Sequence, residues 1–185
     1  VNTEYEIHCF EPAKATFAAL KENLGSRENV VLVNKAVSDI KQERSIFYDT
    51  EKSGLASLYK RNLKAHSIAF NKSEIIGTIR LDEYIRNTHV SHIHFMKIDI
   101  EGHELTAFKG MGNYLNADFI DFIQFEYGGA NLDSKTSLME FYELFEEKGF
   151  KIAKIMPKGL QIRDYKPYME NFDYANYVAI SKKKV

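Results

Sequence analysis

The sequence has few of the features that build disulfides, bilayer spans or polyanion-binding surfaces. One cysteine, Cys9, rules out an internal disulfide and lies in an apolar run where a small buried thiol is expected. No apolar stretch approaches the roughly 20 residues that span a bilayer, and no signal-peptide pattern opens the chain. The 25 basic and 26 acidic residues balance, so nucleic acid is not an expected partner. We therefore expect a soluble, cytoplasmic protein without membrane insertion.

The chain also lacks internal repeats and low-complexity tracts. Its 185 residues, of which 44% are hydrophobic, suffice for one apolar core and are too few for two comfortable ones. We therefore expect a single domain over residues 1–185.

Hydrophobic periodicity predicts an α/β fold. An early strand, helix and strand form a parallel βαβ unit, and two late strands suggest an antiparallel hairpin. The polar segment 52–73 is expected to be a mobile excursion covering a site. The expected strands are 5–10, 29–37, 43–49, 75–81, 92–100, 118–127, 151–156 and 176–181, and the expected helices are 13–24, 81–87, 103–115 and 134–148.

Acidic side chains lie at the ends of three of these strands, where each apolar run stops. They are Glu11, the pair Asp99 and Glu101, and Glu126. In an open parallel sheet, ligands bind outside the carboxyl ends of the strands. Glu11 can accept hydrogen bonds from both hydroxyls of an adenosine ribose, or it can cap the helix that follows; both readings stay open.

The segment MKIDIEGHE, residues 96–104, places charged groups against an apolar strand. Alternation puts Lys97 and Asp99 on the face opposite Ile98, and a partly buried lysine needs a partner. Asp99 and His103 are the residue types that remove a proton from a hydroxyl. The alternative is a salt-bridged turn that caps the next helix.

No metal ion is assigned from the sequence. His92 and His94 share one face of a strand but lack a third ligand nearby, so an ordinary pair at a strand entry is the preferred interpretation. Asp99 and Glu126 could hold Mg²⁺ at adjacent strand ends through oxygen ligands and waters. Position alone supports this second site.

Three motifs in order resemble the FkbM methyltransferase family: FEP at 10–12, NKAVSD at 34–39 and, most specifically, KIDIEGHE at 97–104. The resemblance runs from about residue 5 to residue 127. It implies a Rossmann-like methyltransferase sheet, mostly parallel with an antiparallel C-terminal hairpin and with helices on both faces. It also implies O-methylation with S-adenosylmethionine as the donor.

The resemblance further implies roles for individual residues. Glu11 would hold the ribose, and Ala36, Val37 and Ser38 would border the adenine. Asp99 would face the reacting methyl group and the acceptor. Glu101, His103 and Glu126 would line the acceptor side.

The sequence departs from the family pattern before the FEP motif. Enzymes of this family carry a first strand followed by a glycine-rich turn that resembles Asp-x-Gly-x-x-x-Gly. The glycines of that turn let the backbone approach the cofactor closely. That strand would lie between the strands ending in Glu11 and Asp99, so its absence would split the sheet. We expect the natural protein to be longer at its N-terminus.

The leading hypothesis is an S-adenosylmethionine-dependent O-methyltransferase acting on a hydroxyl of a small molecule or sugar. A nucleotide-cofactor oxidoreductase is an alternative, since an acid after the second strand also suits NAD, but the sequence lacks Gly-x-Gly-x-x-Gly. A non-catalytic binding module of the same fold is the other alternative. Which acceptor is methylated is not readable from the residues.

Overall fold

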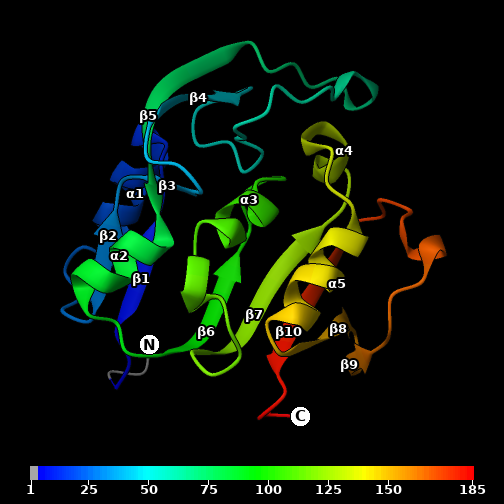
Figure 1. The fold of residues 1–185 in the computed structure, drawn as a ribbon. Coiled ribbons are helices and arrows are strands. Elements are labelled where there is room, and N and C mark those ends of the chain that lie inside the picture. Colours follow the sequence, from blue (N-terminus) through cyan, green and yellow to red (C-terminus); the bar gives the residue numbers. More distant parts are fainter. Residues whose placement is uncertain (1–3) are drawn as a thin grey trace.

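The computed structural model describes residues 4–185, which form a mixed α/β fold with three β-sheets and several helices (Figure 1). Along the chain, the α-helices all lie between strands. They are α1 (Lys14–Leu24), α2 (Leu81–Thr88), α3 (Glu104–Lys109), α4 (Ala130–Ser134) and α5 (Leu138–Glu147). Short 3₁₀ turns cover Lys64–His66, Gly112–Tyr114 and Pro167–Met169.

The largest sheet has five strands in the order β6-β7-β10-β8-β9. Strands β6 and β7 are parallel, and the other neighbours in this sheet are antiparallel. The two late strands β8 and β10 pair antiparallel, but they do not form the expected hairpin directly, because β9 lies between them in sequence and pairs with the other edge of β8. The strands are β6 (Ile93–Ile98), β7 (Ile120–Tyr127), β8 (Phe150–Met156), β9 (Gly159–Ile162) and β10 (Ala175–Ser181).

Two smaller sheets hold the first half of the chain. Strands β1 (Ile7–Phe10) and β2 (Val30–Val33) pair in parallel around α1, as the βαβ pattern predicts. Strand β5 (Lys72–Arg80) pairs in parallel with β3 (Ala36–Ser38) and antiparallel with β4 (Glu43–Tyr48).

The expectation of a mostly parallel sheet is wrong for the described strands. Three strand pairings are parallel and four are antiparallel, because β4 runs against β5, β9 runs against β8, and β10 runs against both β7 and β8. Among the described residues, the expected helices on both faces are not found on the five-stranded sheet. The apolar cluster on the face opposite α3 and α5 consists only of strand residues.

The sheets are divided between β1 and β6, where the sequence predicts a split because the first strand of the FkbM pattern is missing from it. Within residues 4–185, β1 pairs only with β2, and β6 pairs only with β7. In the described part of the chain, neither strand has a β partner on its other edge. The strand that ends in Glu11 and the strand that ends near Asp99 therefore belong to different sheets.

The single strand expected over 29–37 is two strands. The break falls at Asn34, whose side-chain amide donates to the carbonyl oxygens of Glu11 (2.8 Å) and Pro12 (3.0 Å). These bonds tie the chain to the end of β1 and redirect it into a second sheet.

The main core packs α3 and α5 against one face of the five-stranded sheet. Phe108, Phe125, Phe141 and Phe145 are fully buried there and make edge-to-face and stacked ring contacts. Helix α5 begins later than predicted because Ser137 forms a capping box with Glu140. No helix in residues 4–185 is both long and apolar enough to cross a membrane.

Candidate functional site

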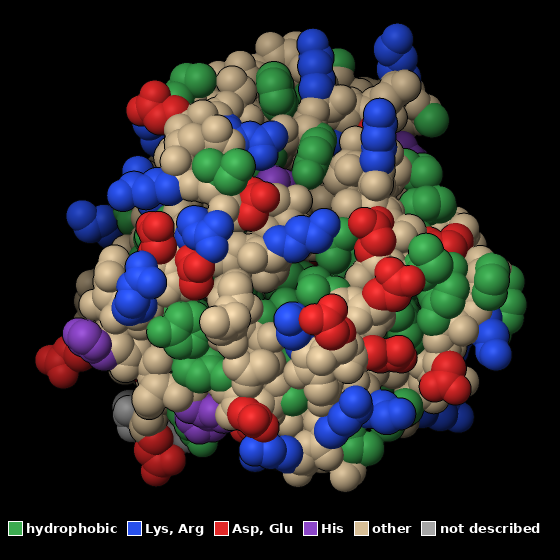
Figure 2. All heavy atoms as spheres, viewed as in Figure 1, with side chains coloured by type: hydrophobic (Ala, Val, Ile, Leu, Met, Phe, Trp, Pro, Cys, Tyr) green, Lys and Arg blue, Asp and Glu red, His purple; other side chains and the backbone are tan. Residues whose placement is uncertain are grey.

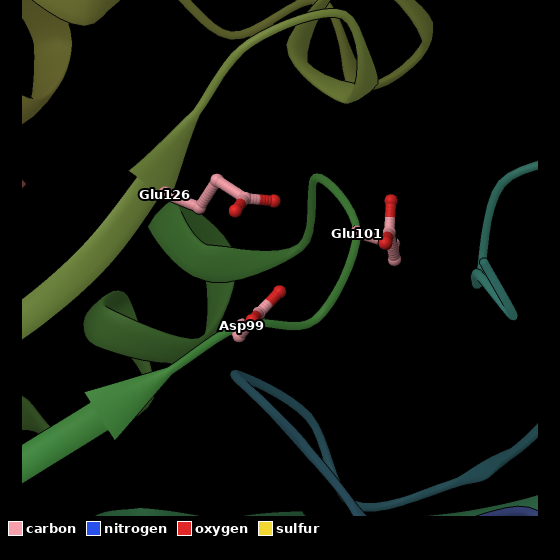
Figure 3. Close-up of side chains that lie close together, drawn as sticks. All are labelled: Asp99, Glu101 and Glu126. Carbon is pink, nitrogen blue, oxygen red and sulfur yellow. The ribbon is translucent and has the colours of Figure 1, made fainter. Parts of the chain in front are cut away.

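Three of the predicted acids meet at the carboxyl ends of β6 and β7. Asp99 and Glu126 project from the two strand ends toward the space between them, and Glu101 stands on the turn after β6 (Figure 3). One carboxylate oxygen from each residue lies within 4.8 Å of the others. The structure thus groups three of the four acids that the strand-end pattern singles out, and Glu11 is not among them.

The turn after β6 has a backbone that fixes Glu101 beside the strand end. Glu101 has φ 53° and Gly102 has φ 95°, so both occupy the left-handed side of backbone space that favours glycine. A Cβ on Gly102 would lie 2.6 Å from the carbonyl oxygen of Ala130. This close approach brings α4 against the turn.

Like charge and burial shape the ionisation of the acids. Burial raises the pKa of Glu101, and the neighbouring Glu126 and Asp99 add to that rise, while Arg61 opposes it. Burial also raises the pKa of Glu126, against a hydrogen bond from Tyr174 that lowers it. Asp99 instead accepts a hydrogen bond from the Lys97 ammonium at 2.7 Å, which supplies the partner expected for Lys97.

His103 is buried behind this turn, and both of its ring nitrogens are engaged. Nε2 shares a hydrogen bond with the Ser38 hydroxyl and Nδ1 with the Tyr59 hydroxyl, each at 3.0 Å. Burial and the nearby Arg44 lower its pKa to about 4, so the imidazole is neutral at pH 7. The residue links β3 to the segment that contains Tyr59.

Ala36, Val37 and Ser38 form β3 and are almost completely buried. The Ser38 hydroxyl also donates to Asp39 (3.2 Å). A Cβ on Gly110 would lie 2.2 Å from the Ser38 carbonyl oxygen, so the helix end of α3 packs directly on this strand. The hydrogen bond between Ser38 and His103, two residues after Glu101, places β3 beside the turn that carries Glu101.

Glu11 lies at the end of β1, in a different sheet from the grouped acids. Its carboxylate accepts the Ala13 backbone N–H at 2.8 Å, as the capping interpretation requires. Burial raises the pKa of Glu11. A carboxylate has about four acceptor positions, so this single bond also leaves room for ribose hydroxyls, and both interpretations stand.

Over residues 2–152, the chain matches the methyltransferase FkbM domain. The chain belongs to the FkbM methyltransferase family. This match favours methyl transfer over the nucleotide-cofactor oxidoreductase. It covers the β1–α1–β2 unit and the acids at the ends of β6 and β7.

Among curated proteins, this FkbM chain is similar to the hexuronic acid methyltransferase AglP of Haloferax volcanii. The two are 28% identical over 148 residues, which is 79% of this chain and 57% of AglP. The chain thus spans a little over half the length of that relative. No solved structure matches the chain significantly.

Two residues of this FkbM chain lie at the site without having been predicted there. Glu104 is buried, and its Oε1 accepts the backbone N–H groups of Ile100 (2.9 Å) and Gly102 (3.3 Å); burial raises its pKa to about 7. Arg61 pairs with Glu101 and with Asp133. Glu104 could have been predicted, because it is an acid inside the KIDIEGHE motif. Arg61 could not, because it lies 40 residues before its partner Glu101 and no local sequence pattern marks it.

The remaining histidine pair is peripheral to the acids. The rings of His92 and His94 lie 4.8 Å apart, and His92 lies 3.3 Å from the Asp121 carboxylate. On the face of the molecule in Figure 2, acidic and basic side chains are interspersed over the left half, whereas several acidic side chains gather over the right half.

Proposed function

We propose that this protein is an S-adenosylmethionine-dependent O-methyltransferase that acts on a hydroxyl group of a sugar. The observation that carries the proposal is the grouping of three carboxylates at the ends of β6 and β7 in a chain of the FkbM family. The proposed fold is a Rossmann-like layer divided between β1 and β6. Its support is the β1–α1–β2 unit and the parallel β6–β7 pair.

A sugar acceptor suits the donor and acceptor inventory of the site. Ionised carboxylates accept hydrogen bonds and donate none, so they match hydroxyl-rich ligands. The relative AglP is named for methylation of a hexuronic acid. We take hexuronic acids as the first acceptor class to test.

The residues present fit the methyl donor at two positions. Glu11 is a strand-end carboxylate with acceptor capacity left for ribose hydroxyls, and Asp99 has a partly exposed carboxylate at the end of β6. Backbone and apolar atoms of Ala36 and Val37 would border the adenine, while the Ser38 hydroxyl is already engaged by His103. S-adenosylmethionine supplies a methyl group on an electrophilic sulfonium.

Glu126 is the best placed group to take the acceptor proton. Burial raises its pKa, which brings it nearer the working pH of a general base. Asp99 is held by Lys97 at 2.7 Å and Glu101 by Arg61, so each already has a cationic partner. Holding the hydroxyl in line with the methyl carbon supplies much of the remaining rate enhancement.

His103 has a different role from the proton acceptor first expected. With both nitrogens hydrogen-bonded to Ser38 and Tyr59, the neutral imidazole orients the turn rather than contacting the acceptor. We therefore assign it to positioning.

The test is methyl transfer by the full natural protein. It is incubated with methyl-labelled S-adenosylmethionine and separately with D-glucuronic acid, D-galacturonic acid and D-glucose. We expect label in a uronic acid product, and Glu11→Gln should weaken S-adenosylhomocysteine binding in calorimetry by about tenfold through loss of a charge-assisted hydrogen bond.

Glu22→Gln, which changes an exposed residue of α1, is the matched control and should bind normally. Absence of calorimetric heat with millimolar S-adenosylhomocysteine would reject the donor. Heat without label transfer to any sugar would reject the acceptor class.

A further inference from the structure

Residues 55–62, which we call the strap, cross from the β4 region to the turn after β6. Ser57 pairs with Phe47 of β4 through both backbone groups, at 3.0 and 2.8 Å. Its hydroxyl donates to the carbonyl oxygen of Glu101 at 2.8 Å. Leu58 is buried beside Ile46 and Ile76 in the core of the three-stranded sheet, so the first half of the strap is firmly packed.

The second half of the strap is held by Arg61. Its side chain is only 8% exposed. The guanidinium donates from Nη1 to the Glu101 carboxylate and from Nε to the Asp133 carboxylate, the latter at 3.3 Å. The backbone N–H of Asn62 also reaches Asp133, at 3.4 Å. Arg61 therefore joins the strap, the turn and α4.

The charges around Glu101 explain why this cation matters to the site. Asp99 at the end of β6 and Glu126 at the end of β7 present negative charge toward Glu101. Glu104 on α3 also interacts with Glu101, but its own pKa is raised to about 7, so it holds a proton below that pH. Tyr174, in the β9–β10 connection, is hydrogen-bonded to Glu126. Lys97 is paired with Asp99, and half of the Lys97 side chain is exposed. Arg61 is the buried cation in direct contact with Glu101, and Asp133 of α4 shares it.

We propose that Arg61 is a positioning residue: it fixes the Glu101 carboxylate on the acceptor side of the site and clamps the strap over the turn. The assignment of Glu101 to the acceptor side rests on the proposed function. A guanidinium suits this task because its planar fork can serve two carboxylates at once. Lysine offers a charge without that geometry.

Loss of the clamp has two separable consequences. Without Arg61, Glu101 faces like charges alone, so it binds a proton at higher pH than in the wild type. The strap then loses its charge-dependent anchor and opens more often, which hydrogen exchange of its backbone amides detects. Protonating Glu101 in the wild type at low pH should release the strap in the same way.

The experiment compares wild type, Arg61→Gln, Arg61→Lys and Glu101→Gln, with the exposed Arg27→Gln as the matched control. In the full natural protein, we expect amides of the strap to exchange at least tenfold faster in Arg61→Gln and Glu101→Gln. Corrected for intrinsic exchange, the acceleration on acidification should be smaller in both variants than in wild type, and the part that remains should come from protonation of His103, which bonds Tyr59 of the strap. Wild type and Arg27→Gln should keep protection at neutral pH and lose it on acidification, and Arg61→Lys should be intermediate.

Activity gives the second readout, with labelled donor and D-glucuronic acid as the probe. The acid limb of kcat/KM should move to higher pH in Arg61→Gln and less in Arg61→Lys, whereas a purely structural defect would lower activity equally at every pH. Should Arg61→Gln fail to fold, Asp133→Asn is the substitute variant because it removes one of the two carboxylates that Arg61 contacts. The strap amides of Asp133→Asn should then exchange faster than in wild type but more slowly than in Glu101→Gln.

The outcomes separate the two proposals. Wild-type methyl transfer with an unmoved acid limb in Arg61→Gln would overturn the positioning role and leave the enzyme assignment intact. Strap amides that exchange at the wild-type rate in both Arg61→Gln and Glu101→Gln would overturn the clamp. The expected exchange pattern without methyl transfer to any sugar would support the clamp and reject the acceptor class.

Discussion

Glu170 caps helix α5 from 32 positions further along the chain, where its carboxylate accepts the backbone N–H of Leu138 at 3.0 Å. The same carboxylate accepts the N–H of Met139 (2.8 Å) and the hydroxyls of Tyr127 (2.5 Å) and Tyr165 (3.1 Å). A negative charge at a helix N-terminus is favourable. One side chain thus joins β7, α5 and the connection before β10.

Replacing Glu170 should destabilise the fold. Glu170→Ala removes four hydrogen bonds to a charged acceptor and leaves two helix N–H groups without it, so we expect a loss of about 2–4 kcal/mol in the free energy of unfolding. Urea denaturation measures this. Glu143→Ala, an exposed change on α5, should cost less than about 0.5 kcal/mol, and equal losses in both variants would contradict the capping role.

Glu104 should make stability fall as pH rises. Burial raises its pKa from 4.5 to about 7, so the folded state holds a proton that the unfolded state has released. The resulting loss in the free energy of unfolding is absent below about pH 4.5 and complete above about pH 7, where it is on the order of 3 kcal/mol. Glu104→Gln mimics the protonated form, and its stability relative to wild type should therefore increase between pH 5 and pH 8 in urea denaturation.

His103 should act in the opposite direction. Its pKa falls from 6.5 to about 4 in the folded state, so protonation favours the unfolded chain. The loss begins below pH 6.5 and grows to roughly 3 kcal/mol near pH 4. Wild-type curves should be nearly flat where the two effects overlap, whereas His103→Gln should leave the Glu104 slope visible. A His103→Gln curve parallel to wild type over pH 4–7 would refute this.

Gly102→Ala should be costly because of both backbone and space. A side chain there meets φ 95° and the Ala130 carbonyl oxygen at 2.6 Å, and we expect about 2–4 kcal/mol of destabilisation. The neighbouring Gly129 has open space around its Cβ position and φ −57°, so Gly129→Ala is the control. Thermal unfolding should lower Tm only for Gly102→Ala.

Glu126→Gln should slow methyl transfer without releasing the donor. A general base contributes about 10²–10⁴ in rate, so kcat should fall within that range while S-adenosylhomocysteine affinity stays within twofold. Steady-state kinetics with labelled donor, alongside calorimetry, provides the check. Glu126→Asp, which keeps a carboxylate, should retain more activity, and a variant as fast as wild type would remove Glu126 from proton transfer.

The local patterns of the sequence predict most elements and the grouping of the acids. Strands that end in an acid follow from apolar runs, and the rule that ligands bind at strand ends places Asp99 and Glu126 side by side. The Lys97–Asp99 pair follows from alternation along one strand. These inferences depend on neighbours in sequence or on parallel strand direction alone.

Other features depend on contacts between distant segments. Arg61 meets Glu101 across 40 residues, and the break at Asn34 depends on carbonyl groups more than 20 positions away. Strand β9 has four exposed residues and no buried face to give alternation. Residue type and position make His103 a candidate proton acceptor, but they do not reveal its distant partners Ser38 and Tyr59.

Within residues 4–185, the edge of β1 away from β2 and the edge of β6 away from β7 have no β partner, which has a practical consequence for handling this polypeptide. A row of unsatisfied amide and carbonyl groups recruits further β-strands, from any chain, into register. On β6 the ring of Phe95 is 57% exposed and would favour such recruitment, while the ammonium of Lys97 opposes it. Self-association that rises with concentration and falls when Phe95 is replaced by lysine is the behaviour to watch for during purification.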